Sequence, residues 1–246
     1  MRRLFGWIIA ALTGLGTAAS LADDAQKPLK VCILSGCETY KSEESLPRFQ
    51  EFLERHYNVV CSRIVRTAVD DLPGLERLDD CDVALVFIKR MQLKGAQLER
   101  FQKYAKSGRP IVAVRTASHA VQTWLEFDKE VLGGNYKGHH PVGPVTQIKI
   151  KSKEAAHPVL AGVELTAVND ALYKNQEHAA DIQVLVEGTI PGQPTEPLAW
   201  TREYKGGRIF YTSLGAQDTF QEPGFRRLLV NALFWTARRD VEAIKK

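Results

Sequence analysis

The sequence has few cysteines, almost no excess charge and only one long hydrophobic run. Four cysteines in 246 residues are too few for a disulfide-stapled scaffold. Lysine and arginine number 33 against 29 acids, and this even balance gives no argument for nucleic-acid binding. The chain contains no internal repeat and no low-complexity tract, which excludes solenoid and fibrous architectures. What remains has the composition and length of a single globular domain with a full core.

The hydrophobic run lies at the N-terminus. Residues 4–19 are apolar apart from threonine and glycine, Arg2 and Arg3 precede them, and a small-x-small sequence at residues 20–22 follows. This pattern predicts a signal peptide over residues 1–22, cleaved after Ala22. An uncleaved anchor would need about 20 apolar residues, and no cysteine follows the cleavage point to carry a lipid. We therefore expect a periplasmic or secreted protein with no stable membrane span after cleavage.

Export would permit disulfides, and four cysteines allow three pairings. Cys32 and Cys81 lie near the starts of predicted strands, whereas Cys37 follows the end of its strand. A strand of about five residues spans ~17 Å, which is beyond the reach of a disulfide. We therefore expect Cys37 to be free and reactive, and Cys32, Cys61 and Cys81 to be small buried core residues.

Strands and helices alternate in the first half of the sequence. Hydrophobic runs predict strands at residues 29–34, 59–65, 82–88 and 110–115. Apolar residues at helical spacing predict helices between them, one ending near Tyr57 and one carrying Leu98, Phe101 and Tyr104. Strands that alternate with helices favour a parallel sheet wound by right-handed crossovers.

The pattern changes after Gly133. Residues 145–150 alternate like a half-exposed strand, and further strands are predicted near residues 182–186, 198–200 and 208–212. Pro223 opens a last helix with a regular apolar stripe. We therefore expect an α/β protein with a mostly parallel sheet flanked by helices, and antiparallel strands added in the second half.

Ligands bind beyond the carboxyl ends of the strands in such a sheet. Three strand ends carry polar groups, at residues 36–40, 115–119 and 213–220, and Lys89-Arg90 add positive charge at a fourth. The turn after the strand that ends at Arg115 is a strand-to-helix elbow, and its following amides would point at a ligand. We expect the functional site at this edge.

Five segments, taken in order, resemble the ThuA-like (trehalose utilisation) family. They are the elbow, the glycine-histidine loop 133–140, the His-Pro motif 157–162, the acid and tyrosine at Asp170 and Tyr173, and the strand segment 207–215. The resemblance covers residues 28–240 as one ThuA-like domain. It implies a flavodoxin-like, class I glutamine amidotransferase-like fold and a bacterial protein of carbohydrate metabolism.

The chain departs from this family at two positions. The family commonly carries histidine where this chain has Arg115 and again where it has Ala216. The elbow also lacks the cysteine that a glutaminase needs, so glutamine is not expected to be a substrate. Ser118 and His119 are adjacent, and neighbouring helical residues are not expected to face each other.

The resemblance implies a protein that acts on a carbohydrate or sugar-derived ligand, with hydrolase-like processing of a glycoside as the favoured activity. The alternative is a non-catalytic carbohydrate-binding or interaction protein, which the missing histidines favour. Candidate catalytic residues are His119, which could exchange protons near neutral pH, Arg115, a fixed planar donor, and Glu177, a carboxylate for acid–base work.

Candidate ligand-binding residues surround the predicted edge of the sheet, and the tyrosines among them could stack on sugar rings. They are Cys37, Thr116, Ser118, Tyr136, His139, His140, Tyr173, Ser213, Gln217 and Asp218. A divalent metal, if one binds, would take His119 with His139 or His140, and Glu177 or His178 as a further ligand. Because adjacent residues on an extended chain point opposite ways, at most one of His139 and His140 is expected to face the site.

Overall fold

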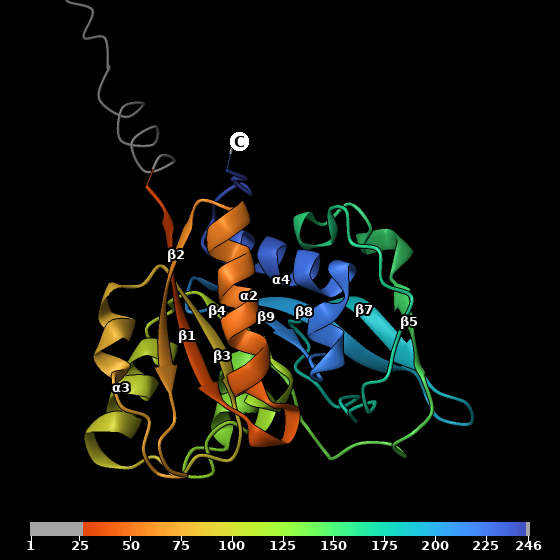
Figure 1. The fold of residues 1–246 in the computed structure, drawn as a ribbon. Coiled ribbons are helices and arrows are strands. Elements are labelled where there is room, and N and C mark those ends of the chain that lie inside the picture. The colour runs from red at the N-terminus through yellow and green to blue at the C-terminus, as the bar shows by residue number, and fades with distance from the viewer. Residues whose placement is uncertain (1–26, 245–246) are drawn as a thin grey trace, which may run out of the picture.

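The computed structural model describes residues 27–244, and its centre is a nine-stranded sheet with helices on both faces (Figure 1). The predicted signal peptide lies outside the described residues. Within residues 27–244, no helix has the length and hydrophobicity needed to cross a membrane.

One half of the sheet is parallel. Its strands follow the order β2-β1-β3-β4-β9, and each neighbouring pair is parallel. All six residues of β3 are buried, as expected for a strand covered on both faces. The bounds of the five strands are Leu29–Gly36 for β1, Val59–Val65 for β2, Val83–Ile88 for β3, Ile111–Val114 for β4 and Gly207–Thr212 for β9.

The other half is antiparallel and continues from β9 through β8 (Glu196–Tyr204), β7 (Gln183–Thr189), β5 (Thr146–Ile150) and β6 (Ala167–Val168). Four of the eight neighbouring pairs are thus parallel and four antiparallel. The expected mostly parallel sheet is not confirmed, and the sheet is mixed. The change from parallel to antiparallel pairing begins where β9 meets β8. The two turn residues between them, Lys205 and Gly206, have positive φ angles (49° and 82°), which close a tight antiparallel hairpin.

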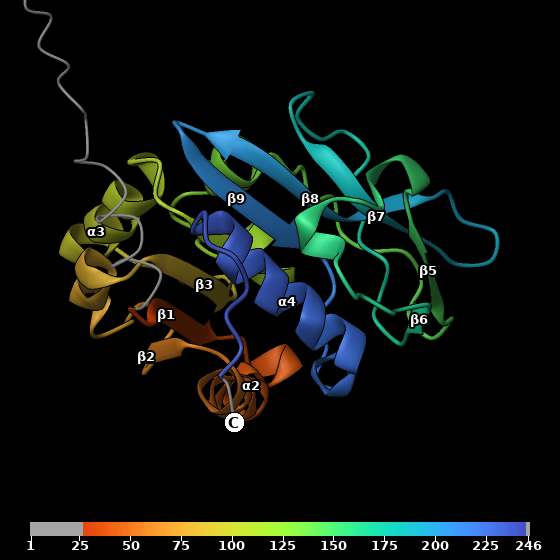
Figure 2. The same ribbon diagram turned by 90° about the horizontal axis from the view of Figure 1, so that it is seen from above.

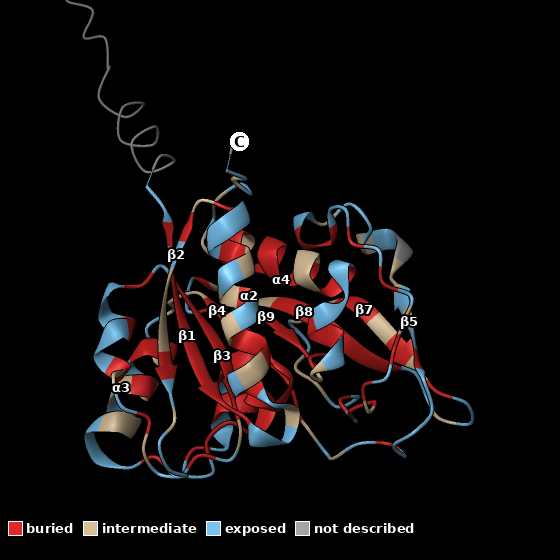
Figure 3. Ribbon diagram, in the orientation of Figure 1, coloured by how far each residue is buried: buried red, intermediate tan, exposed pale blue. Residues whose placement is uncertain are grey.

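Helices cover the two faces unequally. Helices α2 (Ser42–His56) and α4 (Pro223–Thr236) lie together on one face, as Figure 2 shows. Helix α3 (Gly95–Lys106) packs on the other face with the short helices η2 (Leu75–Asp80), η3 (Arg115–His119) and η4 (Phe127–Leu132). Alternate β1 residues enter the two cores, and Figure 3 shows β1 and β3 buried along most of their length, whereas the outer strands β2 and β5 are partly exposed.

The parallel half brings four chain segments to one edge of the sheet. Strands β1, β3, β4 and β9 all end there, because parallel strands present their carboxyl ends together. The segments that follow them are η1 (Glu38–Tyr40), residues 89–90, η3 and residues 213–217. This is the edge at which the sequence predicts the site.

Candidate functional site

The elbow after β4 is built around Arg115. Its φ angle is 49°, a left-handed conformation that is uncommon for a residue with a side chain. In hydrolases a strained strand-to-helix turn exposes a nucleophile, but here the turn carries an arginine, and its side chain is 1% exposed. The helix that follows, η3, is a single short 3-10 segment, so the expected binding of a ligand by a helix N-terminus is not supported.

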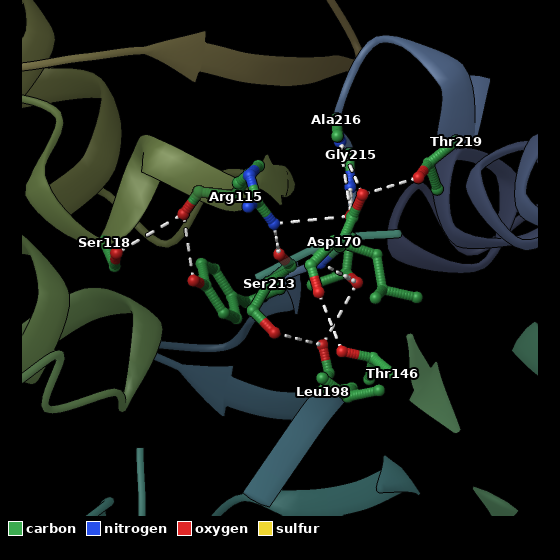
Figure 4. A network of polar contacts seen from close by, with 12 residues as sticks. Arg115, Ser118, Thr146, Asp170, Leu198, Ser213, Gly215, Ala216 and Thr219 are labelled. Carbon is green, nitrogen blue, oxygen red and sulfur yellow. Dashed lines mark hydrogen bonds and ion pairs between the residues drawn. The ribbon is translucent and has the colours of Figure 1, made fainter. Parts of the chain in front are cut away.

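The Arg115 guanidinium is held by its surroundings through one terminal nitrogen (Figure 4), whereas its Nε is buried with no partner among the described residues. One terminal nitrogen lies 3.3 Å from Asp170 Oδ2 and donates to the Ser213 carbonyl at 2.6 Å. The group also lies over the rings of Tyr40 and Tyr173, 4.0 and 4.8 Å from their centroids. Arg115 is therefore held as part of the scaffold, and Ser213 contributes its backbone to it.

Asp170 ties this arginine to the loop after β9. Its carboxylate accepts hydrogen bonds from the backbone N–H groups of Gly215 and Ala216, at 2.6 and 3.2 Å, and from the Thr219 hydroxyl at 2.6 Å. Figure 4 shows these bonds converging on one side chain, which is 2% exposed. Asp170 was part of the family resemblance but was not among the predicted site residues.

His119 contacts its own neighbour. Its Nδ1 lies 3.1 Å from Ser118 Oγ, so the expectation that these two side chains would not face each other is wrong. The tight 3-10 turn brings them together, although no carboxylate among residues 27–244 contacts the imidazole to complete a catalytic triad. Burial, followed by the positive charges of Arg90, Lys89 and Arg115, lowers the pKa of His119 to about 3. The ring is neutral at physiological pH, and proton exchange by it near pH 7 is not supported.

Two tyrosines pack against His119. The Tyr136 ring stacks on the imidazole, with centroids 4.5 Å apart and planes 20° from parallel. Tyr173 packs on Tyr136 at 4.6 Å and on His119 at 6.2 Å. Tyr173 is buried, whereas Tyr136 is half-buried and forms the accessible side of the stack. We call Arg115, Ser118, His119, Tyr136 and Tyr173 the elbow cluster.

Asp128 holds the glycine loop beneath Tyr136. Its Oδ2 accepts from the Tyr136 N–H at 2.8 Å, whereas its Oδ1 is buried with no partner among the described residues. A Cβ on Gly134 would lie 2.3 Å from Oδ1, so only glycine fits there. Burial, opposed by the Tyr136 hydrogen bond and the charge of Lys129, raises the pKa of Asp128 to about 7. The sequence contained no signal for this residue.

Two predicted ligand-binding residues lie beneath the elbow. Cys37 is free and completely buried, and the Thr116 hydroxyl donates to the Ile88 carbonyl at 2.9 Å. Burial is the main reason that the pKa of Cys37 is raised. The expected freedom of Cys37 is confirmed, but its expected accessibility is wrong, because the following turn folds over it. Cys32, Cys61 and Cys81 are also free, and Cys61 is half-buried.

The other predicted residues make their contacts elsewhere. Glu177 is exposed and accepts from Asn135 at 3.1 Å, without contact to His119 or Arg115. His140 is buried between Gln193 and Glu196, 2.8 Å from each, and exposed His139 contacts the next carbonyl. Gln217 donates to Glu44 at 2.6 Å, and Asp218 lines a separate cavity of about 240 Å³ beside β6.

The suggested metal ligands are not assembled. Among residues 27–244, no group of three or more histidine, cysteine, aspartate or glutamate side chains is placed to hold a metal ion. His119 is engaged by Ser118 and the tyrosines, whereas His140 is engaged by Glu196. A metal site built on His119 with one of His139 and His140 is therefore not supported by the described residues.

Comparison with known proteins identifies relatives of this fold. The family model described as trehalose utilisation (ThuA) matches residues 30–236. No curated protein gives a significant match. A solved ThuA-like protein from Parabacteroides merdae is 19% identical, with a TM-score of 0.69 over 89% of this chain and 93% of that one. A second, from Bacteroides uniformis, is 19% identical, with a TM-score of 0.65 over 88% of this chain and 94% of that one.

A β-galactosidase from a Rahnella species is also similar in structure. It is 12% identical, with a TM-score of 0.60, and the similarity covers 89% of this chain but 33% of the galactosidase. At these identities the solved structures establish a common fold and nothing about the reaction.

Proposed function

The chain belongs to the ThuA family, and we propose from this premise that it binds a carbohydrate or sugar-derived ligand at the elbow cluster. The family description, trehalose utilisation, gives the role its carbohydrate character. The position of the cluster supports the proposal, since it lies where parallel strands end together.

The observation that carries the proposal is the stack of Tyr136 on His119. Tyr136 is half-buried and presents an apolar ring with a polar tip, which suits the mixed surface of a sugar. The neutral imidazole beside it offers a hydrogen-bonding nitrogen, Nε2, that has no partner among the described residues. An aromatic wall with a few fixed polar groups is the usual construction of a small-molecule site.

Binding is favoured over hydrolysis by the carboxylates of the site. Glycoside hydrolysis generally uses two carboxyl groups on either side of the scissile bond. Asp170 is saturated by four donors, and exposed Glu177 contacts Asn135 instead. The elbow cluster itself contains no acid.

Hydrolase-like processing of a glycoside is the second candidate, and Asp128 is the observation that favours it. A carboxyl group with a pKa of about 7 still carries its proton over part of the physiological range, as a general acid must. Asp128 accepts a hydrogen bond from the backbone N–H of Tyr136, the residue whose ring is proposed to meet the ligand.

Calorimetry on the purified chain from Asp23 onward, with trehalose and other mono- and disaccharides, tests both candidates. Tyr136→Ala should weaken binding roughly tenfold, the effect of losing an interaction of about 1.4 kcal/mol. Leu125→Ala, which alters an exposed side chain outside the cluster, should change nothing. If the wild type releases monosaccharide and Asp128→Asn does not, the protein is a hydrolase. If Tyr136→Ala binds the sugar with the same affinity as the wild type, the site lies elsewhere.

We further propose a flavodoxin-like, class I glutamine amidotransferase-like core in the parallel half. Numbered among themselves, its five strands follow the order 2-1-3-4-5, which is the flavodoxin-like order. An experimental structure in which β9 does not pair with β4 would refute this.

We also propose export with cleavage after Ala22, on the strength of the basic, apolar and small-residue segments of the N-terminus. Mass spectrometry of the protein from its native cell should find a chain that begins at or near Asp23. Recovery of the intact chain from the cytosol would refute export.

A further inference from the structure

The order of the parallel strands points to one position along the candidate edge. The order reverses between β1 and β3, which lie side by side although the chain leaves them toward opposite faces. In open α/β sheets, ligands bind at such a switch point, beyond the carboxyl ends of the strands. Residues 89 and 90 follow β3 at this point, and Lys89 reaches across to the Thr39 hydroxyl at 2.7 Å.

The backbone holds Arg90 next to the elbow. Its φ angle is 49°, again left-handed, and its N–H donates to the His119 carbonyl at 2.9 Å. Met91 repeats the pairing one residue later, with its N–H 2.7 Å from the Ala120 carbonyl. Arginine seldom adopts this conformation, and strained residues of this kind cluster at functional sites. The segment after β3 is therefore fixed along η3.

The charges at this edge do not cancel. Asp170 compensates Arg115, and the nearby cations Arg66 and Lys41 pair with Glu38 and Glu44. Neither Lys89 nor Arg90 has a carboxylate partner among residues 27–244, and the Arg90 side chain is exposed.

The unpaired charges lie close to the aromatic stack. The positive charges of Arg90 and Lys89 lower the pKa of His119, and that of Arg90 opposes the rise in the pKa of Tyr136 that burial causes. The one acid beneath the stack, Asp128, is buried against the backbone of Tyr136. The Arg90 backbone is bonded to His119, on which Tyr136 stacks, so Arg90 and its neighbour Lys89 lie at the stack that is proposed to meet the sugar.

We infer that the ligand is an acidic sugar derivative, with its ring on Tyr136 and its carboxylate or phosphate on Arg90 and Lys89. A guanidinium binds either anion through two parallel hydrogen bonds, and an ammonium adds a point charge. The inference rests on the proposed function, because it assumes that the Tyr136 stack meets a sugar ring.

Calorimetry with glucose, glucuronate and glucose 6-phosphate separates the ring from the anion. At low salt, an acidic sugar should bind the chain from Asp23 onward at least ~10-fold more tightly than glucose, and high salt should reduce this advantage. Arg90→Ala should weaken the acidic sugar roughly ten- to hundredfold, the usual effect of losing a charged hydrogen bond, and leave glucose unchanged. The affinity of Arg90→Lys for the acidic sugar should lie between those of the wild type and Arg90→Ala. Lysine keeps the charge but cannot form the two parallel hydrogen bonds of a guanidinium.

The matched control is Arg48→Ala, which removes an exposed arginine on α2 and should have no effect. The acid that binds more tightly, glucuronate or glucose 6-phosphate, identifies the anion. If the protein binds glucose and both acids equally well, and Tyr136→Ala weakens that binding, the inference is overturned and the proposed function stands. If an acidic sugar binds only when Arg90 is present, binds Tyr136→Ala as well as the wild type and is displaced by inorganic phosphate, both the inference and the proposed function are overturned. Failure of all three sugars to bind would overturn the inference, and the trehalose titration would then decide the proposed function.

Discussion

Arg115 and Asp170 form an ion pair at 3.3 Å in which the side chains are 1% and 2% exposed. The pair joins the turn after β4 to the segment between β6 and β7, and the Asp170 carboxylate also receives two N–H groups from the loop after β9. Three parts of the chain that are distant in sequence therefore meet at one charge pair. This places Arg115 in the scaffold of the site, where it supports the residues that could contact a ligand.

Arg115→Ala should destabilise the protein strongly, because Asp170 would remain as a buried charge without its partner. Breaking a buried pair from one side costs about 3–5 kcal/mol, which corresponds to a fall in melting temperature of about 6–20 °C for a domain of this size. Asp170→Asn should act in the same direction. Thermal melts and urea denaturation measure both variants.

An exposed ion pair supplies the control. Arg55 and Glu51 pair on the surface of α2 with side chains 68% and 64% exposed. Arg55→Ala should change the free energy of unfolding by less than about 1 kcal/mol. If Arg115→Ala melts like Arg55→Ala, the buried pair does not have the structural role assigned to it.

Helices and strands could be predicted wherever the hydrophobic pattern of neighbouring residues determines them. The run at residues 59–65 coincides with β2, and the last helix begins at Pro223 as its apolar spacing predicts. The mixture of parallel and antiparallel pairs could not be predicted, because pairing depends on contacts between distant segments. The end of the first helix, predicted near Tyr57, is also confirmed, since α2 ends at His56.

The site could be predicted only in part, because some of its contacts join residues that are distant in sequence. The turn after β4 brings Arg115, Ser118 and His119 to one region, as the chain topology implied, and the loop after η4 adds Tyr136. The direction of each side chain was not available from sequence. His140 turns to Glu196, a residue 56 positions away, and the elbow arginine is buried by Asp170, 55 positions away. Such choices depend on tertiary contacts that no local pattern records.

His119 should remain uncharged between about pH 5 and pH 8, because its pKa is lowered to about 3. Since the unfolded imidazole protonates near 6.5, this group favours folding above that pH, and its contribution is lost as the pH falls toward 3. Imidazole NMR spectra should show no titration of His119 in this range, and Arg90→Ala should raise its pKa without restoring 6.5, since burial is the main cause. A titration midpoint near 6.5 in the wild type would contradict the structure.

The native cysteines should react slowly with a thiol reagent, with Cys61 first. Cys61 is half-buried on the outer strand β2, whereas Cys32, Cys37 and Cys81 are 5% exposed or less. Burial raises the pKa of Cys61 to about 12, so this thiol lacks thiolate at neutral pH. Hydrogen bonding with Cys32 lowers the pKa of Cys81 to about 7, but Cys81 is only 5% exposed, which limits access of the reagent. Peptide mapping after brief labelling should find the modification at Cys61, and all four cysteines should label in denaturant. Early labelling of Cys37 would show that the turn over it opens.

Asp128 should make the stability of the protein depend on pH. Its folded pKa of about 7 exceeds the ordinary 3.8, so the folded state holds this proton more tightly than the unfolded state. The resulting stability is fully present below pH 3.8 and is lost as the pH rises through about 7. Its size is about 4 kcal/mol at most. Over part of this range His119 changes stability in the opposite direction, so the wild-type profile alone cannot separate the two groups.

The comparison with Asp128→Asn isolates the carboxyl group, because the amide keeps the shape and cannot ionise. Relative to the wild type, the variant should gain stability between about pH 4 and pH 7, and the difference should become constant above pH 7, where both states of the wild type have lost the proton. Urea denaturation at a series of pH values measures this difference. Asp80→Asn, which alters a side chain that is 87% exposed, should leave the profile unchanged. Parallel stability profiles for Asp128→Asn and the wild type would show that the buried carboxyl is ionised in the folded protein, and would remove the observation that favours a hydrolase.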